Sequence, residues 1–362
     1  MIRIIIILSA VLLASCADTR FGSDWYTYRG NFERTGVSSD PGPSDNPVLV
    51  WKLEMGELSG SSPAIADGFL YCGHEKGIIS VNAYTGEKLW EFETARKVFS
   101  TPTYHEGNVY FGSWEMNFYS LKARTGELDW RYEGLASFSG SAAVSGKEIY
   151  VGSRGGQFLS IDLFEGSENW SFITSNWITA SPAYDGRAAY FGGRDSVFYA
   201  VDLKSRELDW IFEAGGDISG TATVNDDRVY FGSNNMKLYC LNSETGEEVW
   251  EFDTGGAMFS SPAIQDGRLY CGSSNSAFYC VDADKGELIW RFETEGAVYS
   301  SPVVCGSRVY FGSHDHHLYS VDIDTGEQVW RYDLGALVSS SPAVYADLLF
   351  AVNDVGAIFA FR

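Results

Sequence analysis

The stretch VYSSPVVCGSRVYFGSHDHHLYSVDIDTGEQVWRYD, residues 298–333, contains one complete structural unit. It holds four short runs that are rich in Val, Tyr, Phe and Trp, and turn residues such as Gly306 and Gly326 separate the runs. Short runs of this kind, bounded by Gly, Asp and Ser, predict β-strands joined by tight turns. The stretch therefore predicts a small sheet of four antiparallel strands.

The same unit recurs with a period of 40 residues. A Trp in the expected fourth strand, a Tyr-x-Gly element and a Ser-Pro element all repeat with this spacing. The repeated tryptophans are Trp90, Trp130, Trp170, Trp210, Trp250, Trp290 and Trp330. Four short strands per 40 residues, with three landmarks in a constant order, are typical of the blades of a β-propeller.

One strand stands outside this rhythm and closes the predicted ring. Eight first strands can be counted, but the last unit reaches Arg362 after only three strands. Residues 48–55, VLVWKLEM, resemble a fourth strand with its own Trp51, and no unit precedes them. We expect them to complete the last blade, because closing the ring removes two sheet edges. The prediction is an all-β, eight-bladed propeller of four-stranded antiparallel blades, formed by residues 48–362 as a single domain.

The repeat resembles a known family. VDIDTGEQVW, residues 321–330, and LNSETGEEVW, residues 241–250, are similar to the tryptophan-docking motif of the pyrroloquinoline-quinone (PQQ)-type propeller repeats. This resemblance implies that each outer-strand Trp, Trp51 included, packs on the neighbouring blade and locks the blades together. DWYTYRGNFERTGVS, residues 24–38, also resembles the leader of such propellers. Arg206 replaces the glycine of the motif, so we expect an altered turn in the fourth blade.

The N-terminus has the layout of a bacterial lipoprotein signal. A basic residue and an apolar run are followed by LASC, residues 13–16, which resembles a lipobox. The resemblance implies cleavage before Cys16 and lipidation of its thiol. We expect a signal peptide at 1–15 and a lipidated leader and linker at 16–47. The mature ring would be a monomer held at the outer membrane by its lipid and facing the periplasm, with the exterior face left open.

Composition and charge limit the classes of partner. The chain is 45% hydrophobic and 15% aromatic, which is sufficient for a large core, and its formal net charge is −22. Such a surface repels phosphate backbones and anionic head groups. Nucleic-acid binding is therefore disfavoured, and we expect contact with the membrane through the lipid anchor alone.

The sequence contains few candidates for catalysis or metal binding. Quinone-dependent dehydrogenases of the resembled family carry a Cys-Cys pair and a calcium site, and this chain has no Cys-Cys dipeptide. We therefore expect neither a catalytic residue nor a cofactor, and PQQ and calcium have no support beyond the fold. His314, His316 and His317 could supply metal ligands. They lie in a hairpin turn, however, which favours an ordinary polar turn.

The cysteines after Cys16 occupy repeat positions and are expected to be small buried residues. One pair could form a disulfide in an oxidising compartment. If the turn of their hairpin centres on Asn275-Ser276, Cys271 and Cys280 lie opposite each other, at a separation that a disulfide can bridge.

One face of the predicted ring carries the most varied residues. The turns between second and third strands and the connections between blades lie on this face, and several of their residues are of types enriched in protein interfaces. The candidate partner-binding residues are Trp114, Met116, Arg154, Arg194, Arg96, Lys97 and Trp177. Basic residues on one face of an acidic protein would also attract an acidic partner.

These features favour a non-enzymatic protein-binding scaffold in the bacterial envelope. The family resemblance extends to the propeller lipoprotein of the outer-membrane β-barrel assembly machinery, which implies that machinery as a partner. Two alternatives stay open. One is a quinone-dependent dehydrogenase-like or electron-transfer protein, and the other is a carbohydrate or cell-wall binding module with Trp114 and Trp177 as stacking platforms.

Overall fold

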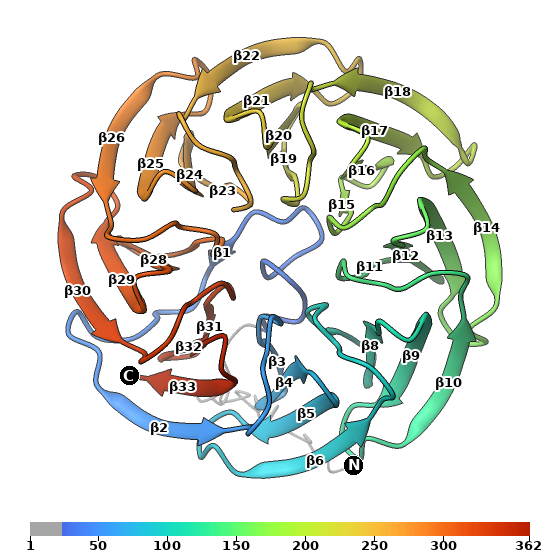
Figure 1. The fold of residues 1–362 in the computed structure, drawn as a ribbon, viewed down its shortest axis with the longest axis horizontal. Coiled ribbons are helices and arrows are strands. Elements are labelled where there is room, and N and C mark those ends of the chain that lie inside the picture. Colours follow the sequence, from blue (N-terminus) through green and yellow to red (C-terminus); the bar gives the residue numbers. More distant parts are fainter. Residues whose placement is uncertain (1–23) are drawn as a thin grey trace, which may run out of the picture.

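The computed structural model describes residues 24–362, which form eight β-sheets arranged around a central axis (Figure 1). This part of the chain contains strands and turns but no helix, so it offers no helix that could span a membrane. Cys16 and the signal peptide expected at 1–15 lie outside the described residues. The predicted all-β, eight-bladed propeller is confirmed.

Each blade has four antiparallel strands that follow one another from the axis outward. The first blade contains β3 (Ala64–Ala66), β4 (Phe69–His74), β5 (Gly77–Asn82) and β6 (Lys88–Glu93). The second contains β7 (Thr103–His105), β8 (Asn108–Gly112), β9 (Asn117–Lys122) and β10 (Leu128–Glu133). The third contains β11 (Ala143–Ser145), β12 (Glu148–Gly152), β13 (Gln157–Asp162) and β14 (Glu168–Ile173). The fourth contains β15 (Ala183–Tyr184), β16 (Ala188–Gly192), β17 (Val197–Asp202) and β18 (Glu207–Glu213).

The remaining blades repeat this arrangement. The fifth contains β19 (Thr223–Asn225), β20 (Arg228–Gly232), β21 (Lys237–Asn242) and β22 (Glu248–Asp253). The sixth contains β23 (Ala263–Gln265), β24 (Arg268–Ser273), β25 (Ala277–Asp282) and β26 (Leu288–Glu293). The seventh contains β27 (Val303–Cys305), β28 (Arg308–Gly312), β29 (His317–Asp322) and β30 (Gln328–Asp333). The last contains β31 (Ala343–Tyr345), β32 (Leu348–Val352), β33 (Ala357–Phe361) and, from the other end of the chain, β2 (Leu49–Glu54).

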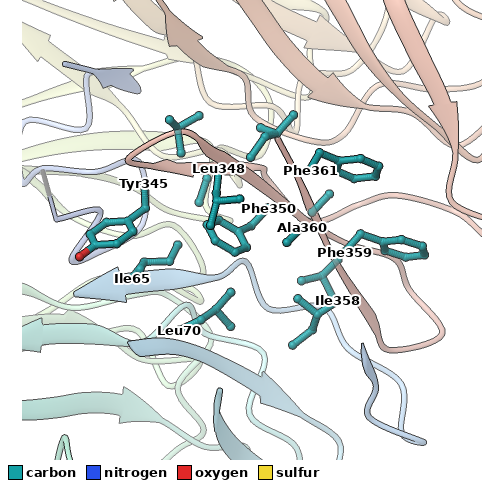
Figure 2. Packing of buried hydrophobic residues seen from close by; sticks show 14 of the residues in the cluster. Ile65, Leu70, Tyr345, Leu348, Phe350, Ile358, Phe359, Ala360 and Phe361 are labelled. Atoms are coloured by element: carbon teal, nitrogen blue, oxygen red, sulfur yellow. The ribbon is translucent and has the colours of Figure 1, made fainter. Parts of the chain in front are cut away.

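The last blade is closed by β2, as the sequence predicted. Lys52 pairs with Phe359 and Glu54 with Ala357 in an antiparallel ladder between β2 and β33. Figure 2 shows the hydrophobic cluster in which this blade meets the first one, with Ile65 of β3 lying near Phe350 of β32. The two ends of the propeller are therefore joined by strand pairing and by a shared core.

The outer-strand tryptophans dock on the next blade. Trp90 Nε1 donates to Ala123 O at 2.9 Å. The ring of Trp90 lies on Gly126, where an added Cβ would come within 2.7 Å of it. The equivalent Nε1 bond is made by Trp51, Trp130, Trp210, Trp250 and Trp290. Trp330 instead packs edge-on against Phe361 at 5.3 Å between ring centres, because the last blade has no such turn.

The fourth blade departs from this docking pattern. Arg206 occupies the glycine position with a φ of 63°. Trp170 Nε1 is buried and has no hydrogen-bond partner in the described part of the chain. We expect Arg206→Gly to raise the free energy of unfolding by about 1 kcal/mol, because glycine adopts this φ without strain. Urea denaturation measures the change. Gly246→Arg in the fifth blade should do the reverse, and a destabilised Arg206→Gly variant would contradict the prediction.

The leader is part of the ring and not a free linker. Trp25 forms a bridge with Ile65 of the first blade, and β1 (Val37–Ser38) pairs in parallel with β27 of the seventh. Between these points the leader follows the inner strands around the axis, and Figure 1 shows its blue trace crossing the centre. Carbonyls that accept an N–H from an inner strand are those of Trp25, Tyr26, Phe32, Glu33, Thr35 and Gly36. The leader therefore packs on the inner strands of blades that lie far apart in the sequence.

Two arginines of the leader are buried at the axis. Arg34 is 0% exposed and donates to the carbonyls of Ala142 and Pro182, in the third and fourth blades. Arg29 is 2% exposed and donates to Pro302 O in the seventh blade. Burial lowers the pKa of each guanidinium to about 10, so both stay charged at neutral pH. They tie inner strands together through backbone oxygens.

The register of the sixth blade does not bring Cys271 opposite Cys280, so the disulfide that the sequence left open is not formed. Cys280 lies opposite Tyr270, and Cys271 lies opposite Tyr279. A shift of one residue in register turns a side chain to the other face of a sheet, so the two thiols point to opposite faces. The five cysteines among residues 24–362 are buried and free.

Candidate functional site

The candidate residues lie at two repeated positions on one face of the ring. One position is in the connection that enters a blade, and the other is in the turn between the second and third strands. The backbone joins them, since Trp114 N–H donates to Lys97 O and Arg194 N–H donates to Trp177 O. The repeat therefore brings a connection side chain and a turn side chain together at the same place in each blade.

Five of the seven candidates form a continuous stack across the second, third and fourth blades. Lys97 Nζ lies 3.7 Å from a ring centre of Trp114, and Arg154 Cζ lies 4.3 Å from the same residue's ring. Arg154 Cζ is also 4.2 Å from the ring of Trp177, and Arg194 Cζ is 5.4 Å from it. All four distances fall within the range of cation–π contacts. We call these five residues the cation–aromatic ladder.

No ion pair within residues 24–362 neutralises the charges of the ladder. Across residues 24–362, no carboxylate lies within ion-pair distance of Lys97, Arg154 or Arg194. Burial, and then the charge of Arg194, lower the pKa of the Arg154 guanidinium below its ordinary value. An arginine nevertheless remains charged at neutral pH. The ladder is thus a local concentration of positive charge on an acidic protein.

Two polar atoms of the ladder lack partners. Trp114 Nε1 and Arg194 Nε are both buried, and neither has a hydrogen bond to any described residue. Buried donors in folded proteins are normally paired. Trp177, by contrast, is 39% exposed. The ladder therefore combines a partly exposed aromatic ring with two buried donors that have no partner among the described residues.

Arg96 and Met116 lie beside the ladder and are not part of the stack. Met116 follows Trp114 in the same turn, has a φ of 72°, and is 48% exposed. Arg96 borders an open depression of about 330 Å³ at the Lys97 end of the ladder. The depression is lined by Glu57, Glu75, Lys76, Arg96, Lys97 and Trp114.

The other blades carry different residues at the two ladder positions. The turn residues there are Glu75, Asn234, Ser274, His314 and Asp354. At this one turn position the carboxylates stand in the first and last blades, and the cations stand in the third and fourth. Glu115, Asp195 and Asp315 stand one residue further along in the turns of the second, fourth and seventh blades.

The axis opens on the same face as a polar funnel of about 200 Å³. A closed ring of hydroxyl side chains forms its wall, and each hydroxyl accepts the backbone N–H of the equivalent residue in the preceding blade. The ring consists of Ser62, Thr101, Ser141, Ser181, Thr221, Ser261, Ser301 and Ser341, and Ser341 N–H donates back to Ser62. Tyr28 of the leader reaches this wall, with its OH 2.8 Å from Ser301 Oγ.

This funnel does not fit the calcium and quinone of the dehydrogenases. None of its lining residues has a carboxylate or amide side chain, whereas protein calcium sites rely on several such oxygens. Its volume is also below the roughly 300–1,000 Å³ of ordinary small-molecule sites. We derive no quinone chemistry from it.

Two of the three candidate histidines, His314 and His317, contact separate partners. His314 Nε2 lies 2.8 Å from Ser339 Oγ, and His317 Nδ1 lies 2.9 Å from Asp315 O. His316 has a φ of 77° in the turn between them. Among the described residues, no three His, Cys, Asp or Glu side chains are grouped so that they could hold a metal ion.

Sequence reasoning missed the residues that face the axis. Arg29 and Arg34 resemble ordinary leader charges in the sequence, and no local pattern marks them as buried. The Ser-Pro element was recognised as a landmark, but the bonding of its hydroxyls requires equivalent units to stand side by side. Only the 40-residue spacing of these hydroxyls could have suggested that they form a closed ring of hydrogen bonds.

A family model and several solved structures are similar to this chain. A family model described as outer membrane protein assembly factor BamB matches residues 45–137, 119–251, 213–283 and 255–362. No curated protein sequence matches. Among solved structures, BamB from Moraxella catarrhalis is similar with a TM-score of 0.76 and 19% sequence identity, over 87% of this chain and 99% of that one.

Two further structures show how widely the fold is shared. The quinohemoprotein alcohol dehydrogenase from Comamonas testosteroni has a TM-score of 0.83 and 12% identity, over 95% of this chain and 81% of that one. The computationally designed Ika8 protein has a TM-score of 0.78 and 14% identity, over 89% of this chain and 100% of that one. At such identities the likeness shows the fold alone.

Proposed function

Because the chain belongs to the family of the outer membrane protein assembly factor BamB, we propose that it is a non-enzymatic scaffold that binds a protein partner in the bacterial cell envelope. The observation that carries this proposal is the cation–aromatic ladder. Tryptophan and arginine supply a large share of the binding energy at protein interfaces. Here they are gathered on one face and have no counter-charge in the described chain.

The ladder is already ordered before any partner binds. Arg154 is held between the rings of Trp114 and Trp177, so its long side chain would lose little further freedom in a complex. Ordering of flexible side chains is one of the main costs of association. A prearranged row of this kind supports recognition of a partner.

The leader supports a specific placement of the ring at a membrane. Asp24 accepts a hydrogen bond from Asp67 N–H, in a turn on the face opposite the ladder. If Cys16 carries the lipid, the eight residues from it to Asp24 span at most about 28 Å. The membrane would then lie near the opposite face, and the ladder would face the periplasm. The family supports a partner in the machinery that assembles outer-membrane β-barrels.

The carbohydrate alternative is less well supported. Sugars stack on the open faces of aromatic rings, but Trp114 is already covered by Lys97 and Arg154. Trp177 is likewise contacted by Arg154 and Arg194. A sugar would have to displace these cations before it could stack.

The proposal predicts that the ladder face captures a protein in living cells. A photocrosslinking residue at position 116, which lies beside the ladder and is 48% exposed in the wild type, should yield a crosslinked envelope protein. The same residue at position 244, in an exposed turn on the opposite face, should not. Replacing Trp114 and Arg154 by alanine should reduce co-purification of that protein at least tenfold, equivalent to about 1.4 kcal/mol. Thermal unfolding should stay close to that of the wild type. Unchanged co-purification from a folded double variant would refute the proposed interface.

A further inference from the structure

We propose that the ladder binds an extended acidic segment of its protein partner, whose carboxylates pair with Lys97, Arg154 and Arg194. This inference rests on the proposed function and names the chemistry of the segment that this face receives. It follows from the charge of the three cations, from the distances between them, and from the carboxylates of the neighbouring blades.

The charges of the ladder require a negative partner. Three cations stand within one stack, and their counter-ions do not come from residues 24–362. Elsewhere on the ring, basic residues such as Arg187 and Lys237 are paired with carboxylates. A protein with a net charge of −22 repels acidic molecules over most of its surface, so the ladder is a site where such a segment can dock.

The spacing of the cations suits an extended chain. Lys97 and Arg154 lie 3.7 and 4.3 Å from Trp114, so they are at most about 8 Å apart. Arg154 and Arg194 lie 4.2 and 5.4 Å from Trp177, which keeps them within about 10 Å. Alternate residues of a β-strand point to the same side at about 6.6 Å spacing. Acidic side chains at three alternate positions could therefore reach the three cations.

The neighbouring blades limit where such a segment can lie. Glu75 stands in the turn of the first blade, next to Lys97, and Asp217 stands in the connection that enters the fifth blade. Both would repel an acidic chain that ran beyond the ladder. Glu115 and Asp195, in the ladder's own turns, accept hydrogen bonds from Ala95 N–H and Ser175 Oγ. The segment is thereby restricted to an arc of three blades, which a stretch of about five extended residues covers.

Synthetic peptides test this inference directly. The probes are fluorescent 12-residue peptides with glutamate at alternate positions, compared with peptides of the same length that carry glutamine instead. Fluorescence anisotropy with the full-length protein in detergent should show at least about tenfold tighter binding of the glutamate peptide. The difference should shrink when the salt concentration is raised from about 0.05 to 0.5 M, because exposed charges are screened. Equal affinity for the two peptides would overturn the inference.

A matched pair of variants assigns the binding to the ladder. Arg154→Glu should weaken binding of the glutamate peptide at least about tenfold. Ser274→Glu places the same charge at the equivalent turn position of the sixth blade and should leave binding within about twofold. Arg154→Lys keeps the charge and should retain most of the binding. Circular dichroism and thermal unfolding show whether each variant is folded. Arg154→Glu lowers the net charge by two units and Ser274→Glu by one. If Ser274→Glu lost half or more of the binding free energy that Arg154→Glu loses, binding would depend on net charge alone, which would overturn the assignment.

The two proposals fail in different ways. If position 116 captures an envelope protein but the glutamate peptide binds no better than the glutamine peptide, the acidic segment is wrong and the scaffold function stands. If the glutamate peptide binds through Arg154 and no protein is captured in cells, the scaffold function is wrong. Phosphatidylglycerol vesicles that bind through Arg154, when the glutamate peptide does not, would overturn the inference in favour of a lipid surface.

Discussion

Replacing residues 48–55 by a glycine–serine linker of equal length is expected to open the ring and lower the free energy of unfolding by at least about 5 kcal/mol, as much as many whole domains possess. The reason is that β2 forms the outer strand of the last blade. Its pairing with β33 would be lost, and so would the bond from Trp51 Nε1 to Ala83 O of the first blade. Strand β33 would become an uncovered sheet edge, and its Phe361, which is 0% exposed in the closed ring, would face solvent. Urea denaturation, followed by tryptophan fluorescence and circular dichroism, measures the loss.

A control moves the closing strand instead of removing it. Val48 N–H donates to Arg362 O at 2.9 Å, so a short hairpin loop can attach residues 48–55 after Arg362. With the linker still in the original place, we expect this chain to recover most of the lost stability. Wild-type stability of the linker variant without the added strand would show that residues 48–55 do not hold the ring closed.

Replacing Arg34 by alanine is expected to lower the free energy of unfolding by about 3–5 kcal/mol. The Arg34 guanidinium donates to Ala142 O, Pro182 O, Tyr28 O and Thr27 Oγ1. Its removal leaves Pro182 O and Tyr28 O without a side-chain donor, at about 1–3 kcal/mol each where water cannot reach them, and it leaves a cavity at the axis. Ala142 O and Thr27 Oγ1 keep their hydrogen bonds to Thr103 Oγ1. Chemical denaturation measures the change.

Two further variants show whether this effect belongs to the buried guanidinium. Arg131 is exposed and pairs with Glu133 on the surface, so Arg131→Ala should change the free energy of unfolding by no more than about 0.5 kcal/mol. Arg34→Lys keeps the charge but lacks the planar fork of donors, so we expect it to recover only part of the loss. Equal effects of Arg34→Ala and Arg131→Ala would mean that the leader lies in the channel without stabilising the blades.

The architecture was predictable because the repeat is self-contained. Strands, turns and the docking tryptophan of one unit lie within about 40 residues, and each unit contacts its neighbours in the same way. Trp90 and Ala123, for example, are 33 residues apart, and the same separation recurs for Trp130 and Leu163. A pattern found once could therefore be extended around the ring to the orphan strand with Trp51.

The candidate site was only partly predictable. Residue type and divergence from the repeat indicated Trp114, Arg154 and Trp177, but the stacking of their side chains depends on the angle between blades. The register in which neighbouring strands pair was harder still to predict from the sequence. The sequence left a disulfide between Cys271 and Cys280 open on the condition that the turn centres on Asn275-Ser276. The turn centres half a residue earlier, which shifts the pairing by one position.

By itself the sequence determined the number of blades, the closing strand and the face that differs between blades, because these follow from contacts that repeat at short and constant separations. Only the tertiary structure decided the course of the leader and the contents of the axis. Contacts there come singly from many blades: Asp40 meets Ala346 across 306 positions, and Arg29 meets Pro302 across 273. No periodicity marks such contacts. The leader crosses the ring only once, and each inner strand contributes only one or two groups to it.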